Sequence, residues 1–140
     1  MNSQNDDQPA QRKANIFTGF LLFLVSIVLF ITTTPLGFIY GIGYTLVTHF
    51  FKGLGGFFLE IAISIDQLGN VIMQHLLNML WLKKGGYKFG NRDETISSVL
   101  GKNKVQNTLT GFGKFIVKIL DTIDSNHVLD SIDYYVEPKN

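Results

Sequence analysis

No Asp, Glu, Lys or Arg occurs between Ala14 and Phe51, and the first half of this run is almost entirely aliphatic or aromatic. About 20 apolar residues in a helix cross a hydrocarbon core that is roughly 30 Å thick. A soluble chain of 140 residues has no need of such a run. A cleaved signal peptide would have a shorter apolar region followed by an A-x-A site, which is missing here. The sequence therefore predicts an all-α membrane protein.

The apolar run needs a break if it is to fit a bilayer. One helix over residues 16–51 would be about 54 Å long at 1.5 Å per residue. The expected break is Thr32-Thr33-Thr34-Pro35, because proline cannot continue a preceding helical turn but suits the first turn of a new helix. The sequence thus predicts a transmembrane hairpin within residues 14–52, with helices at about 16–33 and 36–52. Both are short for a perpendicular span, so a single span remains the alternative.

Two glycines give the second of these helices a surface for close packing. Gly37 and Gly41 are four residues apart, and small residues at this spacing let another membrane helix approach closely. Glycine is also common in membrane helices without this role. The expected partner for the glycine surface is a second copy of the chain, in a homo-oligomer, or another structural protein of the same assembly.

Residues 53–82 begin with a glycine-rich break and then have the pattern of an amphipathic helix. From Phe57 to Leu82, apolar residues recur every three or four positions and polar residues line another face. Placing Glu60 or Asp66 at mid-bilayer would cost roughly 2.5–3.5 kcal/mol each. The helix is therefore expected to lie in the membrane interface, with Trp81 at its interfacial end.

Residues 83–140 are predicted to form a small helical segment that is first basic and then acidic. Eight basic and two acidic residues occur from Lys83 to Lys118, whereas five acidic residues and one basic residue follow. A capped helix is expected to start near Asp93 and to end at Gly101, with further helices at about 107–123 and 127–136. Anionic lipid headgroups are the favoured partner of the basic part, and nucleic acid is a weaker candidate. The predicted headgroup contacts are Lys52, Trp81, Lys83, Lys84, Lys88 and Arg92.

Few residue patterns in the chain point to chemistry. The absence of cysteine excludes disulfides, thiolate metal sites and cysteine nucleophiles. A hydrolase triad of Ser98, His127 and Asp124 has no G-x-S-x-G turn to hold its serine. Side chains of suitable type for a divalent metal, but without a close ligand spacing, are Asp93, Glu94, His127 and Asp130. Helix capping by Asp93 and Glu94 explains these residues better, so no enzyme activity, metal or cofactor is expected.

Two polar motifs stand out after the apolar run: D-Q-x-x-N on the predicted third helix and D-E-T-x-S-S after a glycine-rich turn. With a histidine near the C-terminus, their residues are Asp66, Gln67, Asn70, Asp93, Glu94, Thr95, Ser97, Ser98 and His127. This half of the chain resembles a family of small phage- and prophage-encoded proteins of undefined activity. That family tends to have proline where Arg92 stands and cysteine where Val128 stands, which weakens a chemical role for His127. The resemblance implies a viral or prophage context and no reaction.

These patterns together favour a structural role in a membrane, with the motif residues acting as folding contacts between the third helix and the D-E-T turn. The expected protein is a component of a phage virion or of its assembly, in a phage internal membrane or the bacterial inner membrane. Residues 1–13 are expected to be a disordered tail, held on the cytoplasmic side by Arg12 and Lys13. The first alternative is a holin-like lysis protein that permeabilises the membrane. The second is a membrane-anchored enzyme or metal-binding protein.

Overall fold

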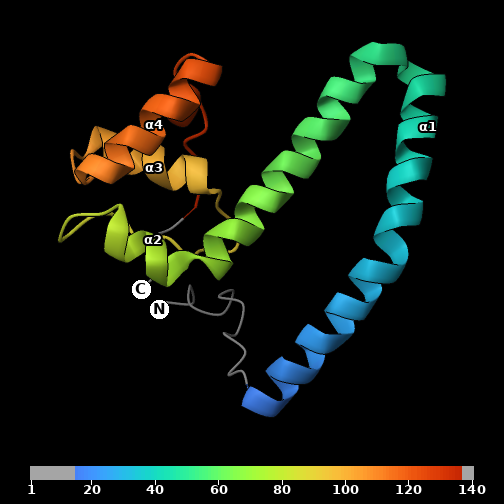
Figure 1. The fold of residues 1–140 in the computed structure, drawn as a ribbon, viewed down its shortest axis with the longest axis horizontal. Coiled ribbons are helices and arrows are strands. Elements are labelled where there is room, and N and C mark those ends of the chain that lie inside the picture. Colours follow the sequence, from blue (N-terminus) through green and yellow to red (C-terminus); the bar gives the residue numbers. More distant parts are fainter. Residues whose placement is uncertain (1–14, 137–140) are drawn as a thin grey trace, which may run out of the picture. The chain divides into compact units, whose positions relative to one another are not determined.

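A computed structural model describes residues 15–136 of the chain, so the predicted tail over residues 1–13 lies outside the described part. All the regular elements within the described part are helices (Figure 1). They are α1 (Ile16–Ile72), α2 (Gln74–Leu80), α3 (Ile96–Val105), α4 (Gly111–Ile123) and α5 (His127–Asp130). The all-α prediction is therefore confirmed. The chain divides into two compact units, Met1–Leu54 and Gly55–Asn140, and each is described by itself.

The first unit contains the apolar part of α1, residues 16–49, which we call the apolar arm. The predicted break at Thr32–Pro35 is wrong, because the helix continues through Pro35. A proline inside a helix removes one backbone donor and crowds the carbonyl four residues earlier, but a helix in apolar surroundings tolerates it where nearby hydroxyls and local adjustments satisfy the freed backbone groups. One turn earlier, the hydroxyls of Thr32 and Thr33 donate to the carbonyls of Val28 and Leu29 at 2.8 and 2.7 Å. Hydroxyl bonds of this kind satisfy polar groups locally and suit a helix in an apolar environment.

The helical path is instead interrupted at Phe50, where the backbone has φ 51° and ψ −159°. Residues other than glycine rarely adopt this backbone conformation. Gly53 is needed just beyond it, since a Cβ there would lie 2.5 Å from the Cβ of His49 and 2.8 Å from Cγ2 of Thr45. The break in α1 thus depends on a strained phenylalanine and a glycine with no room for a side chain.

Replacing Phe50 with glycine should stabilise the protein by about 1 kcal/mol, because glycine adopts a positive φ without strain. The matched control is Phe51→Gly, since Phe51 is equally exposed but helical, and glycine there should destabilise by about 1 kcal/mol. Thermal unfolding in detergent micelles, followed by helical circular dichroism, measures both. Equal effects of the two substitutions would show that Phe50 is not strained.

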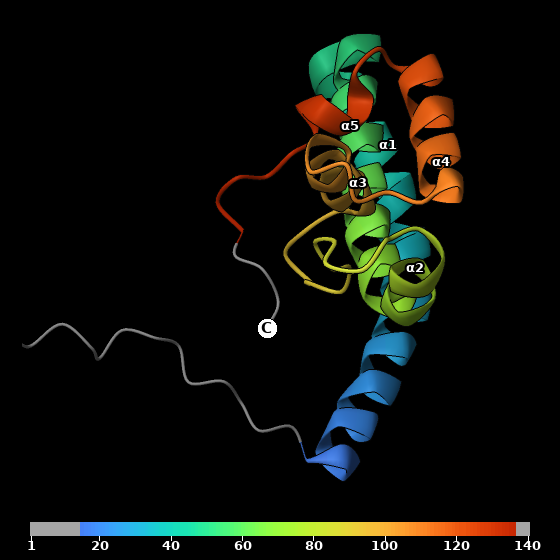
Figure 2. The ribbon, with the colours of Figure 1, turned by 90° about the vertical axis from the view of Figure 1, so that its left-hand side faces the viewer.

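In the second unit, the predicted helix over 57–82 forms but has an interruption. Met73 separates the end of α1 from the start of α2. Its backbone angles (φ −92°, ψ 1°) depart from those of a helix, but its N–H still bonds to the carbonyl of Gly69 at 2.9 Å. The second unit also contains α3 and α4, which lie side by side, and α5, which packs against both (Figure 2). We call the described residues 55–136 the helical module.

The core of the helical module is small and lies between α2, α3, α4 and α5. An isolated antiparallel bridge joins Leu82 to Leu109 and holds the end of α2 beside the start of α4. Phe89 packs edge-on against Trp81, with ring centroids 5.9 Å apart. The buried apolar residues are Leu77, Leu82, Phe89, Val99, Leu100, Leu109, Val117 and Val128.

Gly101 has a different role from the predicted helix end. It lies inside α3 and is buried, and a Cβ at this position would clash with the backbone carbonyl of Val128 on α5. The helix ends only after Val105. The last predicted helix, over 127–136, is also shorter than expected, because α5 stops at Asp130. Gly101 therefore sets the close approach of α3 and α5 and does not terminate a helix.

Candidate functional site

A buried carboxylate, Glu94, is the centre of the polar part of the helical module. Its side chain is fully buried and lies 2.6 Å from Nζ of Lys102 through Oε1. The same oxygen accepts a hydrogen bond from the Ser98 hydroxyl at 2.7 Å, and Oε2 accepts one from the Tyr87 hydroxyl at 2.9 Å. Ser98 and Lys102 follow Glu94 at four-residue intervals, so α3 presents both on one face. We call these four residues the Glu94 cluster.

Lys102 closes the cluster on its other side. Its Nζ donates to the Tyr87 hydroxyl at 3.3 Å and lies 4.5 Å from the centroid of the Tyr87 ring. Burial alone would lower the pKa of Lys102, but its hydrogen bonds with Glu94 and Tyr87 raise it above the usual range. Burial, together with the hydrogen bond to Glu94, also raises the pKa of Tyr87. At neutral pH the cluster therefore contains a cationic lysine and a neutral tyrosine, arranged to stabilise an ion pair.

Stability should consequently fall when the solution becomes strongly alkaline. Both pKa values are higher in the folded protein than in the unfolded chain, so the stabilisation is complete below about pH 10 and is lost as the pH rises through the folded pKa values. Thermal unfolding in detergent at a series of pH values should show a falling midpoint above pH 10. The Lys102→Gln variant, which has no titrating ammonium here, should show a weaker fall. A wild-type midpoint that stays constant through this range would contradict the assignment.

Asn70, at the end of α1, fixes the backbone that carries Glu94. Its side chain is completely buried, and Nδ2 donates to the carbonyls of Glu94 at 2.7 Å and Asn91 at 2.9 Å. Its Oδ1 accepts from the N–H of Gly90 at 2.9 Å. One asparagine thus satisfies three polar backbone groups in the connector between α2 and α3.

Asp66, one turn before Asn70, contacts the start of α3. Its Oδ2 accepts a hydrogen bond from the backbone N–H of Ser97 at 3.2 Å. Thr95 is the N-cap of α3 and accepts from the Ser98 N–H at 3.0 Å. A carboxylate and a hydroxyl at a helix N-terminus satisfy its free donors and interact favourably with the helix dipole. The D-Q-x-x-N and D-E-T-x-S-S motifs are therefore brought together through Asp66, Asn70 and the start of α3.

Several motif residues lie outside this arrangement. Asp93 is exposed and lies 3.6 Å from Arg92 in a surface pair, so it is not the expected helix cap. Gln67 is half-buried on α1. His127 begins α5 and lies 3.1 Å from Asp124. The partners of Ser98 are different residues, since its hydroxyl donates to Glu94 and accepts from the N–H of Asp133 at 2.9 Å.

The other predicted contact residues are spread over both units. Among the predicted headgroup contacts, Trp81 is half-buried against Phe89, whereas the basic residues are exposed: Lys52, Lys83, Lys84, Lys88 and Arg92. A Cβ at Gly37 would meet no atom within 4 Å, and Gly41 is half-buried. Across residues 15–136, no group of three or more His, Asp or Glu side chains is arranged to hold a metal ion.

Three important residues of the site were not singled out by the sequence. Tyr87 and Lys102 belong to the Glu94 cluster, and Asn103 holds the backbone of Tyr87 through bonds to its N–H (2.9 Å) and its carbonyl (2.8 Å). For Lys102, the spacing in the sequence could have indicated its role, since it lies eight residues after Glu94 and therefore about two helical turns along the same face. Asn78 likewise lies two turns after Asn70 and binds both backbone groups of Phe89, at 2.8 and 3.2 Å.

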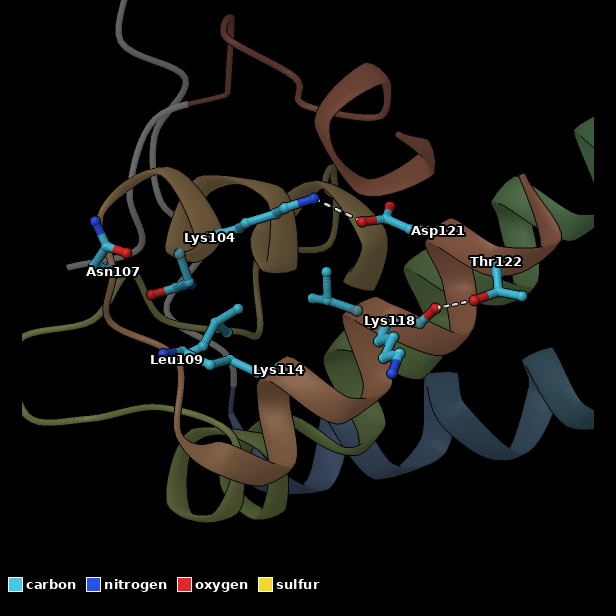
Figure 3. A pocket seen from close by; sticks show the side chains of 9 residues that line it. Lys104, Asn107, Leu109, Lys114, Lys118, Asp121 and Thr122 are labelled. Carbon is cyan, nitrogen blue, oxygen red and sulfur yellow. Dashed lines mark hydrogen bonds and ion pairs between the residues drawn. The ribbon is translucent and has the colours of Figure 1, made fainter. Parts of the chain in front are cut away.

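A groove of about 400 Å³ lies between α3 and α4, on the surface of the helical module (Figure 3). Lys104 extends across it to Asp121, with Nζ and Oδ2 2.6 Å apart. Burial would raise the pKa of Asp121, but its bonds with Lys104 and the Val128 N–H lower it. Lys114 and Lys118 also line the groove. Its net character is therefore basic.

The fold and site together define an all-helical protein in which α1 is long and apolar enough to cross a membrane. Its polar residues form a satisfied internal network, because every buried side-chain nitrogen or oxygen of the described residues has a hydrogen-bond partner. Comparison with protein families, with curated proteins and with solved structures found no match.

Proposed function

We propose that this chain is a non-catalytic structural protein of a membrane, in which the apolar arm lies in the bilayer and the helical module lies at its surface. The observation that carries the proposal is the exposure of the arm. The most apolar 18-residue stretch of α1 has no buried residue. A core helix of a soluble protein would be mostly covered by the rest of its own chain.

The free energy of leaving this arm in water supports the same proposal. Full burial of one large aliphatic or aromatic side chain contributes about 1.5–3 kcal/mol, and exposed examples recur through the arm, such as Phe17, Val28, Phe30 and Ile39. A bilayer removes this surface from water without requiring a protein partner. A signal sequence would share these properties, but its apolar region usually has about 7–15 residues, whereas the apolar arm covers residues 16–49.

In its last turns, α1 has polar residues on its inner side and apolar residues on its outer side. Asn70 is completely buried, whereas Ile65 and Ile72 are 64% and 70% exposed. Glu60 is exposed among these apolar residues, and a carboxylate at mid-bilayer is costly. These observations favour an interfacial position for this segment and a single span made within the apolar arm. The arm is longer than the roughly 20 residues that cross a hydrocarbon core, so the span would be tilted or would extend into the headgroup regions.

The structural rather than enzymatic character of the proposal follows from the Glu94 cluster. Its carboxylate is fully buried and bonded to three partners, so it offers no free group to a substrate. We further propose that the membrane is that of a phage virion or of its assembly site in the host, because the two polar motifs resemble those of phage-encoded proteins. In that context the helical module would contact other structural proteins or further copies of the chain.

Cysteine labelling tests the topology directly, because the natural chain has no cysteine. We would place single cysteines at Ser3, Lys52 and Ser131, express each variant in bacteria, and add a membrane-impermeant maleimide. Lys52 is exposed and is preferable to its neighbour Gly53, which has no room for a side chain. The expected result is that positions 52 and 131 label from one side and position 3 from the other. Equal labelling of all three in the soluble fraction would overturn the membrane proposal.

A holin-like function is the second candidate, and one feature of the apolar arm favours it. A side chain at Gly37 would have open space around it, so this surface is free to contact the same surface of other copies in the membrane. The proposal of a structural protein predicts that high expression leaves the membrane potential intact. Collapse of the potential, abolished by Gly37→Leu, would favour the holin-like function instead.

A further inference from the structure

Helix α4 has an apolar face that no other described part of the chain covers. Its other side is fixed against the core by Gly113 and Val117, both buried, and a Cβ at Gly113 would lie 2.6 Å from the carbonyl oxygen of Trp81. This close contact sets the rotation of α4 about its axis. The residues that consequently point outward, at spacings of three and four, are Phe112, Phe115, Ile119 and Ile123, which are 53%, 56%, 43% and 80% exposed. We call them the α4 stripe.

The α4 stripe continues into an aromatic surface. The rings of Phe112 and Phe115 have centroids 6.4 Å apart, and those of Phe112 and Trp81 are 6.2 Å apart. Tryptophan and phenylalanine next to aliphatic residues are typical of surfaces in the headgroup region of a bilayer. The stripe is therefore part of a larger apolar surface that includes the end of α2.

Basic side chains border one edge of the stripe. Lys114 and Lys118 are exposed on α4 and line the groove between α3 and α4 (Figure 3). Lys104 is neutralised by Asp121, whereas among the described residues Lys114 and Lys118 have no ion-pair partner. A helix with aromatic and aliphatic residues on one face and lysines beside them is suited to an anionic lipid surface, where lysines reach phosphate groups and apolar residues enter the acyl boundary.

We propose that α4 lies on the surface of an anionic bilayer, with the α4 stripe buried among the lipids and with Lys114 and Lys118 bound to lipid phosphates. This inference rests on the proposed function, because the apolar arm keeps the helical module beside the membrane. A second copy of the chain is a poorer occupant. Four residues are few compared with the 20–30 that each partner contributes to a stable interface, and pairing two stripes would bring like-charged lysines together.

Spin labels on the full chain test this proposal. We would place a label at Ile119→Cys in the stripe and a control label at Gln106→Cys, which is exposed just after the end of α3. The protein would be incorporated into nanodiscs of phosphatidylcholine and phosphatidylglycerol. Collision with oxygen and with a water-soluble nickel chelate would then be measured. We expect position 119 to be accessible to oxygen but not to nickel, and position 106 to be accessible to nickel.

The other outcomes separate this inference from the proposed function. Accessibility of position 119 to nickel, in protein that has entered the nanodiscs, would overturn the α4 inference alone. Protection of position 119 from both reagents would show a protein contact there and would also overturn it. Failure of the chain to enter nanodiscs would overturn the proposed function and this inference with it.

The lysines provide a second, independent measurement. Removing both charges with Lys114→Gln and Lys118→Gln should reduce the ratio of membrane-bound to membrane-free α4 about 30-fold, as two lysines at about 1 kcal/mol each imply. This ratio is measured as the share of labels at position 119 that are protected from nickel. Phosphatidylcholine alone should have a similar effect on the wild type. Lys84→Gln with Lys88→Gln is the control pair, because both lysines are exposed and lie outside the groove. The sequence predicts headgroup contacts for these two lysines, so the pair tests the alternative contact surface, and we expect it to cause a smaller loss than the α4 pair. An equal loss in the control pair, or binding that is insensitive to anionic lipid, would overturn the proposal.

Discussion

Replacing Glu94 with alanine is expected to lower the free energy of unfolding of the helical module by about 3–5 kcal/mol. The substitution leaves the ammonium of Lys102 in a largely buried position without its counter-charge, since this side chain is only 12% exposed. It also removes the acceptor for the hydroxyls of Ser98 and Tyr87. The measurement is thermal or denaturant unfolding of the full chain in detergent micelles.

Its neighbour Asp93 provides the control, because it is exposed and pairs only with Arg92. Asp93→Ala should change stability by less than about 0.5 kcal/mol. The double variant Glu94→Gln with Lys102→Met should recover part of the loss, because it leaves no unpaired charge inside the module. Equal effects of Glu94→Ala and Asp93→Ala would show that the buried ion pair does not stabilise the fold.

Asn70→Ala is expected to have the next largest effect, about 3 kcal/mol of destabilisation. The side-chain amide of Asn70 bonds to the carbonyls of Asn91 and Glu94 and to the N–H of Gly90. Each buried backbone group left without a partner costs roughly 1–3 kcal/mol, and this cost is smaller where water can enter. The connector that carries Glu94 should also become more accessible. Hydrogen exchange of residues 89–97 and thermal unfolding measure the two effects.

Gln67→Ala is the matched control for Asn70→Ala, since Gln67 lies on the same helix and is half-exposed. It should change stability by less than about 0.5 kcal/mol and leave hydrogen exchange of the connector unaltered. If Asn70→Ala were as mild as Gln67→Ala, the two motifs would not be joined through Asn70.

The secondary structure could be predicted where the apolar periodicity was long and regular. The predicted helix over 57–82 corresponds to the end of α1 together with α2, and the predicted helix over 107–123 corresponds to α4. One repeating apolar pattern is sufficient to place such a helix. The break in the apolar run was predicted at the wrong residue. Pro35 costs the helix one hydrogen bond, whereas the positive φ at Phe50 depends on the close packing of Gly53 against Thr45 and His49, which a local sequence pattern does not reveal.

The candidate site could be predicted in part. Asp66, Asn70 and Glu94 stood out because they are polar residues within recognisable motifs. Tyr87 and Lys102 did not, because a tyrosine in a glycine-rich connector and a lysine in a basic segment have the composition of solvent-exposed residues. Only the packing of the connector on α3 places them around a buried carboxylate.

The sequence alone determined that this chain is helical and that it contains an apolar helix long enough to cross a membrane, because composition and periodicity are properties of each segment by itself. The tertiary structure decided which residues share an environment. It buried Glu94 with Lys102, used Gly101 to bring α3 against α5, and left the α4 stripe exposed. These features depend on contacts between segments that are distant in the chain, and no local pattern contains them.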